Sequence, residues 1–266
     1  MKKTLYVFLS SIFLFANANI LYSAEETDTY SDFAVDKKYS SFVNAILTDN
    51  IKAITEFINN GANLEQPVCE GMTVLMIAAE RSSFETVKLL VEKGANVNAV
   101  NTYIRETSYI KNGDFDDKRF NFGYNAGTAY ENIGMNRTVL MYALNNKDLK
   151  VVKFLLDKGA DITVRDMYGE DILFYAVAKN NPRITELLID RGANVNVKDN
   201  KGRTPLMYAI MQKRTQDYYN YGIITFLIEK GANVNETDND GNTALTYAKK
   251  YSAHDVIKIL SDNGAE

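Results

Sequence analysis

The chain has 266 residues, of which 46% are hydrophobic, with 15 glycines and 3 prolines. This composition excludes a fibrous or disordered chain and leaves enough apolar material for one extended core. The formal net charge of −4 disfavours nucleic-acid binding, which needs a clustered basic surface. The single cysteine, Cys69, excludes an internal disulfide, so we expect a free spectator thiol in preference to an intermolecular bridge.

The first 24 residues have the pattern of a secretory signal peptide. Lys2 and Lys3 precede an apolar run over residues 5–15, and small residues then offer cleavage points after Ala18 and after Ala24. The run is too short to span a bilayer comfortably, which favours cleaved export over an uncleaved membrane anchor. Cleavage removes both lysines and changes the net charge to −6. We therefore expect a periplasmic or secreted bacterial protein that begins with an acidic linker over residues 25–35.

One short phrase then recurs six times along the chain. KGANVN stands at Lys93–Asn98 and again at Lys230–Asn235, and its variants place glycines at Gly61, Gly94, Gly159, Gly192, Gly231 and Gly264. These glycines are 33 residues apart except for intervals of 65 and 39, and such a period indicates stacked structural units. Each follows an apolar helical stretch, where glycine suits the left-handed residue that ends a helix.

A second motif lies in each unit and predicts the start of another helix. Residues suited to an N-cap precede an apolar run in five units, at Thr73, Thr138, Asp171, Thr204 and Thr243. Pro205 follows its threonine at the first helical position. The second helix of a unit is predicted from a capping box at Ser82 and Glu85, and from Asn181 followed by Pro182. Each unit therefore reads as turn, helix, helix, turn.

These motifs resemble the ankyrin repeat. Asp199–Ala209 matches the family pattern Asp-x-x-Gly-x-Thr-Pro-Leu-His-x-Ala almost in full, and Asp238–Ala248 follows it closely. The family histidine is replaced in each of the five units that carry this motif, by Met76, Met141, Phe174, Met207 and Thr246, so apolar packing should hold neighbouring units together there. The first unit retains only its second helix, around Phe57 and Ile58, and its glycine turn.

The resemblance implies an all-α ankyrin-repeat solenoid with turn fingers over residues 36–266. About six helix-turn-helix repeats are expected, at 36–66, 67–101, 134–166, 167–199, 200–238 and 239–266. A long insert over residues 102–133 interrupts the array, and six extra residues around Gln216–Tyr221 lengthen the loop between the helices of repeat five.

The sequence offers little catalytic or metal chemistry. Its single histidine, His254, lies at the start of a predicted helix in the last repeat, where a structural role is favoured. The acidic stretch Asp238–Gly241 lacks the bidentate glutamate of a calcium loop and coincides with a repeat turn, and Asp114–Asp117 is read as a solvated acidic turn. We expect no catalytic, metal or cofactor residues, and a protein that is not an enzyme.

Aromatic residues mark the predicted contact surfaces. The insert carries seven aromatics in 32 residues, about twice the 11% of the whole chain, and its Phe120–Tyr124 alternation predicts a strand or hairpin. A column of tyrosines at one helix position, Tyr142, Tyr175, Tyr208 and Tyr247, is read as packing first and binding second. The predicted partner-binding residues are Tyr103, Tyr109, Phe115, Phe120, Phe122 and Tyr124 in the insert, with Tyr168 and Lys201 in the turns of repeats four and five.

The resemblance and these residues favour an exported, monomeric module that binds another protein through its concave face, turn fingers and insert. Membrane contact is not expected after signal cleavage. Two alternatives stay open. One is an enzyme or a small-molecule or metal sensor with its site in the insert, and the other is a secreted effector that acts on a host protein.

Overall fold

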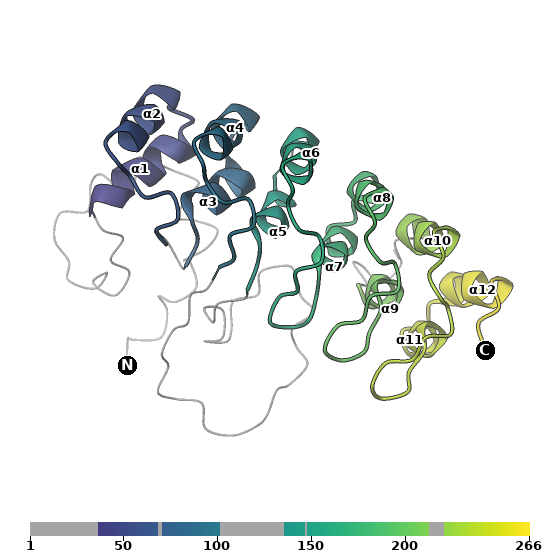
Figure 1. The fold of residues 1–266 in the computed structure, drawn as a ribbon. Coiled ribbons are helices and arrows are strands. Elements are labelled where there is room, and N and C mark those ends of the chain that lie inside the picture. The colour runs from purple at the N-terminus through teal and green to yellow at the C-terminus, as the bar shows by residue number, and fades with distance from the viewer. Residues whose placement is uncertain (1–36, 69–70, 102–135, 147, 213–220) are drawn as a thin grey trace, which may run out of the picture.

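The computed structural model describes residues 37–68, 71–101, 136–146, 148–212 and 221–266. Within these ranges the chain forms six pairs of helices stacked in one row (Figure 1). The odd-numbered helices make an inner layer and the even-numbered helices an outer layer, and long loops leave each outer helix for the next inner one. The pairs are α1 (Lys37–Leu47) and α2 (Ile51–Asn59), α3 (Val74–Arg81) and α4 (Phe84–Glu92), α5 (Val139–Ala143) and α6 (Leu149–Asp157), α7 (Ile172–Ala178) and α8 (Pro182–Asp190), α9 (Pro205–Met211) and α10 (Tyr221–Glu229), α11 (Ala244–Lys250) and α12 (His254–Asp262).

This arrangement confirms the all-α solenoid with stacked repeats. The described ranges contain no β-strand, and Val100 and Thr138 form an isolated antiparallel bridge. The first unit contradicts the prediction of a single helix, because both α1 and α2 form. The rings of Phe42 and Phe57 pack together across these helices, with their centroids 5.1 Å apart. The signal peptide, the linker, Cys69, the insert 102–133 and residues 213–220 lie outside the described residues.

The helix starts follow the predicted caps. Thr73, Thr138, Thr204 and Thr243 each accept a hydrogen bond from the backbone N–H three residues on, and Asp171 accepts one from Leu173 N at 2.9 Å. Asn181 and Pro182 start α8 as predicted. The capping box at Ser82 and Glu85 is wrong. Ser83 caps α4, because the Ser82 hydroxyl instead donates to Ile46 O of the preceding repeat at 3.0 Å.

The recurring glycine ends each outer helix in the left-handed conformation. The six glycines have φ between 79° and 95°. At Gly94 the local hydrogen bonds form a Schellman motif, since Gly94 N donates to Val91 O and Ala95 N donates to Leu90 O, both at 3.0 Å. The helix therefore stops at the same point in every unit, which fixes where the next turn begins.

The last asparagine of the repeated phrase joins neighbouring units, which explains why the phrase recurs. Asn196 Nδ2 donates to Gly231 O at 3.1 Å, and its Oδ1 accepts from Asn233 N at 2.8 Å. Asn98 and Asn235 make the same pair of bonds to their following units. Repeat three has Thr163 at this position. Its contacts to repeat four are instead Arg165 Nη1 to Lys198 O and an ion pair between Asp157 and Arg191, each at 2.8 Å.

The core consists of two clusters that meet at α7, where Leu173 belongs to the first cluster and Phe174 to the second. Every residue of α7 is buried, whereas the outer helix α6 buries one stripe that includes Val151 and Leu155. The positions of the missing family histidine are buried in four units, at Met76, Met141, Phe174 and Met207. Thr246 is exposed and instead bonds within its own turn, so apolar packing at this position fails only in the last repeat. Among the described helices, none is long and apolar enough to cross a membrane.

Candidate protein-interaction surface

Three consecutive turn fingers present their tips side by side. Finger four (residues 160–171), finger five (193–204) and finger six (232–243) each join an outer helix to the next inner helix. Asn200 N donates to Tyr168 O at 3.0 Å, and Asn239 N donates to Lys201 O at 2.9 Å. The side chains of Asn200 and Asn239 add a second bond each, to Met167 O and to Asn200 O, at 3.0 Å. Two bonds therefore hold each tip against the next.

One aspartate shapes each of these fingers from inside. Asp166 Oδ1 accepts from Tyr168 N at 2.8 Å and from Glu170 N at 2.9 Å. Asp199 and Asp238 accept the equivalent pairs of amides in their fingers. These bonds account for the acidic turn at Asp238, which the sequence analysis assigned to a repeat turn in preference to a calcium loop. In the described ranges, no group of three or more His, Cys, Asp or Glu side chains is placed to hold a metal ion.

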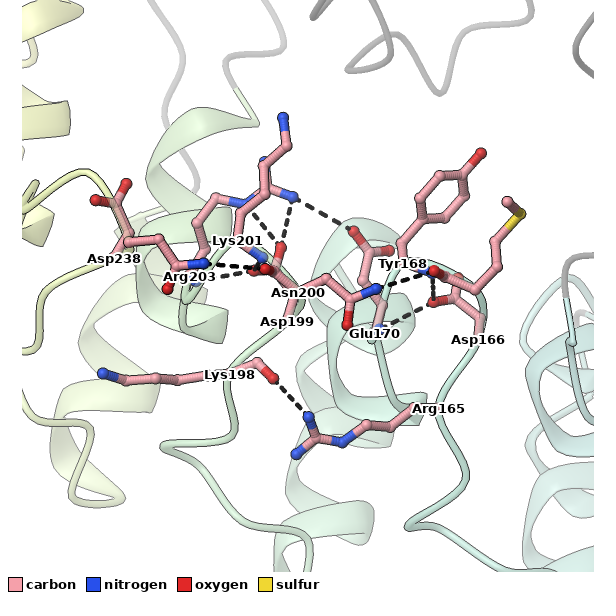
Figure 2. A network of polar contacts seen from close by, with 12 residues as sticks. Arg165, Asp166, Tyr168, Glu170, Lys198, Asp199, Asn200, Lys201, Arg203 and Asp238 are labelled. Carbon is pink, nitrogen blue, oxygen red and sulfur yellow. Dashed lines mark hydrogen bonds and ion pairs between the residues drawn. The ribbon is translucent and has the colours of Figure 1, made fainter. Parts of the chain in front are cut away.

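The two predicted binding residues that the structure describes lie on neighbouring finger tips. Tyr168 is half-buried and Lys201 is exposed, and both side chains project to the same side of the fingers (Figure 2). Met167, beside Tyr168, is 39% exposed, an unusual value here for a large apolar side chain. The other six predicted residues, Tyr103, Tyr109, Phe115, Phe120, Phe122 and Tyr124, lie outside the described residues.

A groove opens beside fingers five and six, against the C-terminal ends of two inner helices. Its volume is about 560 Å³. The lining combines charged side chains with apolar surface: Asn200, Lys201, Arg203, Asp238, Asn239, Asp240 and Asn242 from the fingers, and Met211, Thr246, Tyr247, Lys250 and Tyr251 from the helices and their ends. Lys201 belongs both to the finger tips and to this groove, so the two features form one continuous surface.

The tyrosine column is a packing element, as predicted. Tyr175, Tyr208 and Tyr247 are buried, and Tyr142 is half-buried. The hydroxyls of Tyr175 and Tyr247 donate to the aspartate at the base of their own finger, Asp166 and Asp238. Tyr208 packs edge-on against Phe174, with ring centroids 5.4 Å apart. These side chains therefore support the fingers from below.

Sequence reasoning missed a cluster of buried charges at the bases of fingers four and five (Figure 2). Arg203 Nε donates to Asp199 Oδ2 at 2.7 Å, and Arg203 Nη2 lies 3.9 Å from Glu170 Oε1. The side chains of Glu170, Arg203 and Asp199 are 9%, 6% and 0% exposed. One signal was present in the sequence, because one position of the repeat motif alternates as Arg137, Glu170 and Arg203.

Burial dominates the electrostatics of this cluster. Loss of water around Glu170 raises its pKa to about 8, with a further contribution from the negative Asp166, while Arg203 acts in the opposite direction. Burial also raises the pKa of Asp166. Burial acts likewise on Asp238, but hydrogen bonds from Tyr247 and Asn242 hold its pKa below the ordinary value. His254, the first residue of α12, is exposed and lies in the last repeat, away from these groups.

The comparisons with known proteins agree with this architecture. The family model described as "Ankyrin repeats (3 copies)" matches residues 15–101, 140–237 and 173–266. The chain is 25% identical over 150 residues, 56% of its length, to BRCA1-associated RING domain protein 1 of Caenorhabditis elegans. It is 35% identical over 63 residues, 24% of its length, to ankyrin repeat, SAM and basic leucine zipper domain-containing protein 1 of Carollia perspicillata. The matches span 17% and 13% of these two relatives, less than a fifth of each. Because the family model covers well over half of the sequence, the chain belongs to the ankyrin-repeat family.

Proposed function

We propose that this chain is an exported protein-binding module whose contact surface consists of finger tips four to six, the adjoining groove and the insert 102–133. Ankyrin repeats generally mediate protein–protein interaction, and the module carries no catalytic role in this proposal. The observation that carries the proposal is the position of Tyr168 and Lys201 on neighbouring finger tips. Two hydrogen bonds hold these tips in register.

The tips suit binding because they are pre-organised. A loop that is already ordered loses little conformational entropy when a partner docks, so more of the contact energy appears as affinity. Tyrosine is also enriched among the residues that dominate binding energy. Met167 and Tyr168 supply apolar contact area, while Lys201 and Asp240 supply charges of both signs at the rim.

The sequence of the insert supports its inclusion in the contact surface. Its doubled aromatic content is unlike that of a disordered linker, which is poor in aromatic residues. In the sequence it joins the end of repeat two to the start of repeat three. Phe120, Phe122 and Tyr124 are its strongest candidates for partner contact.

The test begins with capture of a partner by the full mature chain from the compartment of origin, identified by mass spectrometry. Affinity for that purified partner is then measured for Tyr168→Ala/Lys201→Ala and for a control, Lys153→Ala/Glu186→Ala, on exposed positions of α6 and α8. The finger variant should bind at least tenfold more weakly, and the control should bind as the parent does. Equal affinities of both variants contradict a role for the finger tips.

A second variant tests the insert. Residues 102–133 are replaced by a short Gly-Ser turn, and both the melting temperature and the affinity for the captured partner are measured. A contact role predicts a melt close to that of the parent with loss of affinity. A stable deletion variant with unchanged affinity removes the insert from the proposal, while the finger-tip test stays independent of this result.

A further inference from the structure

A continuous cluster of buried and half-buried ionisable side chains lies where repeats three, four and five meet. We call it the junction cluster and define it as Arg137, Asp166, Glu170, Tyr175, Asp199, Arg203 and Tyr208. Its members Asp166, Glu170, Asp199 and Arg203 connect finger four to finger five (Figure 2). It holds three carboxyl groups and two guanidinium groups, so the carboxyl groups outnumber the guanidinium groups by one.

The partners of the two aspartates are clear from the geometry. Arg203 donates to Asp199, and Tyr175 donates to Asp166 at 2.8 Å while it accepts from Arg137 Nε, also at 2.8 Å. Both aspartates accept two backbone amides as well. Each aspartate therefore has a set of donors that stabilise its charged form, although burial outweighs these donors at Asp166 and raises its pKa.

Glu170 lacks such a set. Its Oε1 lies 3.9 Å from Arg203 Nη2, beyond hydrogen-bond distance, and that guanidinium already serves Asp199. Asp166 and Asp199 bring like charge close to it from fingers four and five, and the charges of Arg203 and Arg137 act in the opposite direction. Tyr208 from α9 and Tyr175 from α7 also face it and are neutral. A buried charge without close donors is costly, and such a group takes up a proton instead.

We propose that Glu170 is the proton acceptor of the junction cluster, and that its protonation couples the docking of repeats four and five to pH. In the protonated state the cluster contains two carboxylates and two guanidiniums. Loss of the proton places a third negative charge between fingers four and five, which weakens their contact. The junction and its finger tips are therefore firmest in acidic solution and loosen as the pH rises.

The direction follows from the difference between the folded and unfolded states. Burial raises the pKa of Glu170 to about 8, and in the unfolded chain a glutamate ionises at about 4.3. Between these values the folded state binds one proton more than the unfolded state. The equilibrium constant for unfolding then increases by about tenfold per pH unit over this interval and levels off above it.

The experiment compares the parent chain with Glu170→Gln, which keeps the size of the side chain and removes its ionisation. Equilibrium unfolding by urea is followed by circular dichroism from pH 5.5 to pH 9. Relative to the variant, the equilibrium constant for unfolding of the parent should increase by about tenfold per pH unit up to about pH 8. The variant lacks the ionisation of residue 170 that causes this increase. The control is Glu236→Gln in finger six, where the hydrogen bond from Lys198 lowers the pKa, so the pH dependence above pH 5.5 should be unchanged.

A parallel pH dependence of Glu170→Gln and the parent overturns the proposal. Should the variant fail to fold, carboxyl titration by NMR of the parent labelled on glutamate decides, because a midpoint near 4.3 for Glu170 excludes the proton acceptor. Hydrogen exchange, corrected for its intrinsic base catalysis, locates the effect. Backbone amides of residues 166–175 and 199–204 should lose protection as the pH rises, while those of residues 86–95 in α4 and its end keep theirs. Uniform loss along the array contradicts a local junction device.

Discussion

Gly202 lies so close to the next finger that a Cβ atom built on it would stand 2.8 Å from the backbone nitrogen of Asn239. That nitrogen donates to Lys201 O, so the close approach is the hydrogen bond that joins the two tips. Gly241 occupies the same position in finger six with a similar φ of 80°, and a Cβ built there has no described neighbour within 4 Å. At Gly241, glycine is therefore needed for the left-handed conformation alone. At Gly202 it is needed both for that conformation and for the close contact with the next finger.

Replacement of these two glycines separates the two roles. Gly241→Ala should cost about 1–2 kcal/mol of unfolding free energy for a left-handed alanine. Gly202→Ala carries the same strain and should lose about 1–3 kcal/mol more, because the backbone of finger five must move away from finger six. Urea melts of both variants measure the difference. Equal losses are incompatible with the contact role of Gly202.

The local features of the fold were predictable because each has a local cause. A threonine before an apolar run caps a helix, and a glycine after one ends it, without help from the rest of the chain. The capping box failed for the opposite reason. Ser82 and Ser83 are both residue types suited to an N-cap, but the Ser82 hydroxyl donates to Ile46 O in another repeat and Ser83 caps α4.

The candidate site was less predictable from sequence. Tyr168 and Lys201 could be placed at the finger tips, since the turn motif fixes their position in the repeat. The burial of Glu170 could not be predicted, because the packing of the next finger decides whether a charged residue at that position is exposed or buried. A repeat period gives the stacking order of the units but carries no information on the depth of each side chain between them.

The bridging asparagine provides a second matched pair. Asn196→Ala removes two bonds between repeats four and five, whereas Asn194→Ala removes a local turn bond that Asn196 N donates to Asn194 Oδ1. At about 0.5–1.5 kcal/mol per hydrogen bond, Asn196→Ala should cost about 1–3 kcal/mol and Asn194→Ala roughly half of that. Thermal melts of the two variants provide the measurement. A larger loss for Asn194→Ala contradicts the bridging role.

The N-cap of α7 should make stability depend on pH. Burial raises the pKa of Asp171 to about 6, above that of an unfolded aspartate, so its contribution is full below about pH 4 and is lost as the pH rises through 6. Threonine caps four other inner helices at this position, at Thr73, Thr138, Thr204 and Thr243. Asp171→Thr should therefore be more stable than the parent by on the order of 1–3 kcal/mol at pH 7.5, with a smaller gain at pH 4.5. Melts at the two pH values, with Thr243→Ala as a cap variant that does not titrate, decide the matter. A gain of equal size at both values rules out ionisation as its cause.

Export predicts a defined mature N-terminus. Cleavage after Ala18 or Ala24 should yield a chain that starts at Asn19 or Glu25, found in a periplasmic or culture-medium fraction. Terminal sequencing of the protein from its native source makes the measurement. Lys2→Glu/Lys3→Glu, which inverts the charge before the apolar run, should reduce export. Intact Met1 on a cytosolic protein contradicts this part of the proposed function.

Stacking predicts that equally buried leucines contribute differently to the free energy of unfolding according to their place in the array. Leu155 in α6 and Leu260 in α12 are both fully buried. Leu155 has repeats on both sides, so Leu155→Ala should cost about 2–5 kcal/mol, the usual loss for a truncated core leucine. Leu260 lies in the last described unit, which can fray without unfolding the rest, so Leu260→Ala should lower global stability clearly less. Urea melts followed by circular dichroism measure both, and hydrogen exchange of α12 shows whether Leu260→Ala frays that unit alone. Equal global losses would mean that the array unfolds as one globular core without nearest-neighbour behaviour.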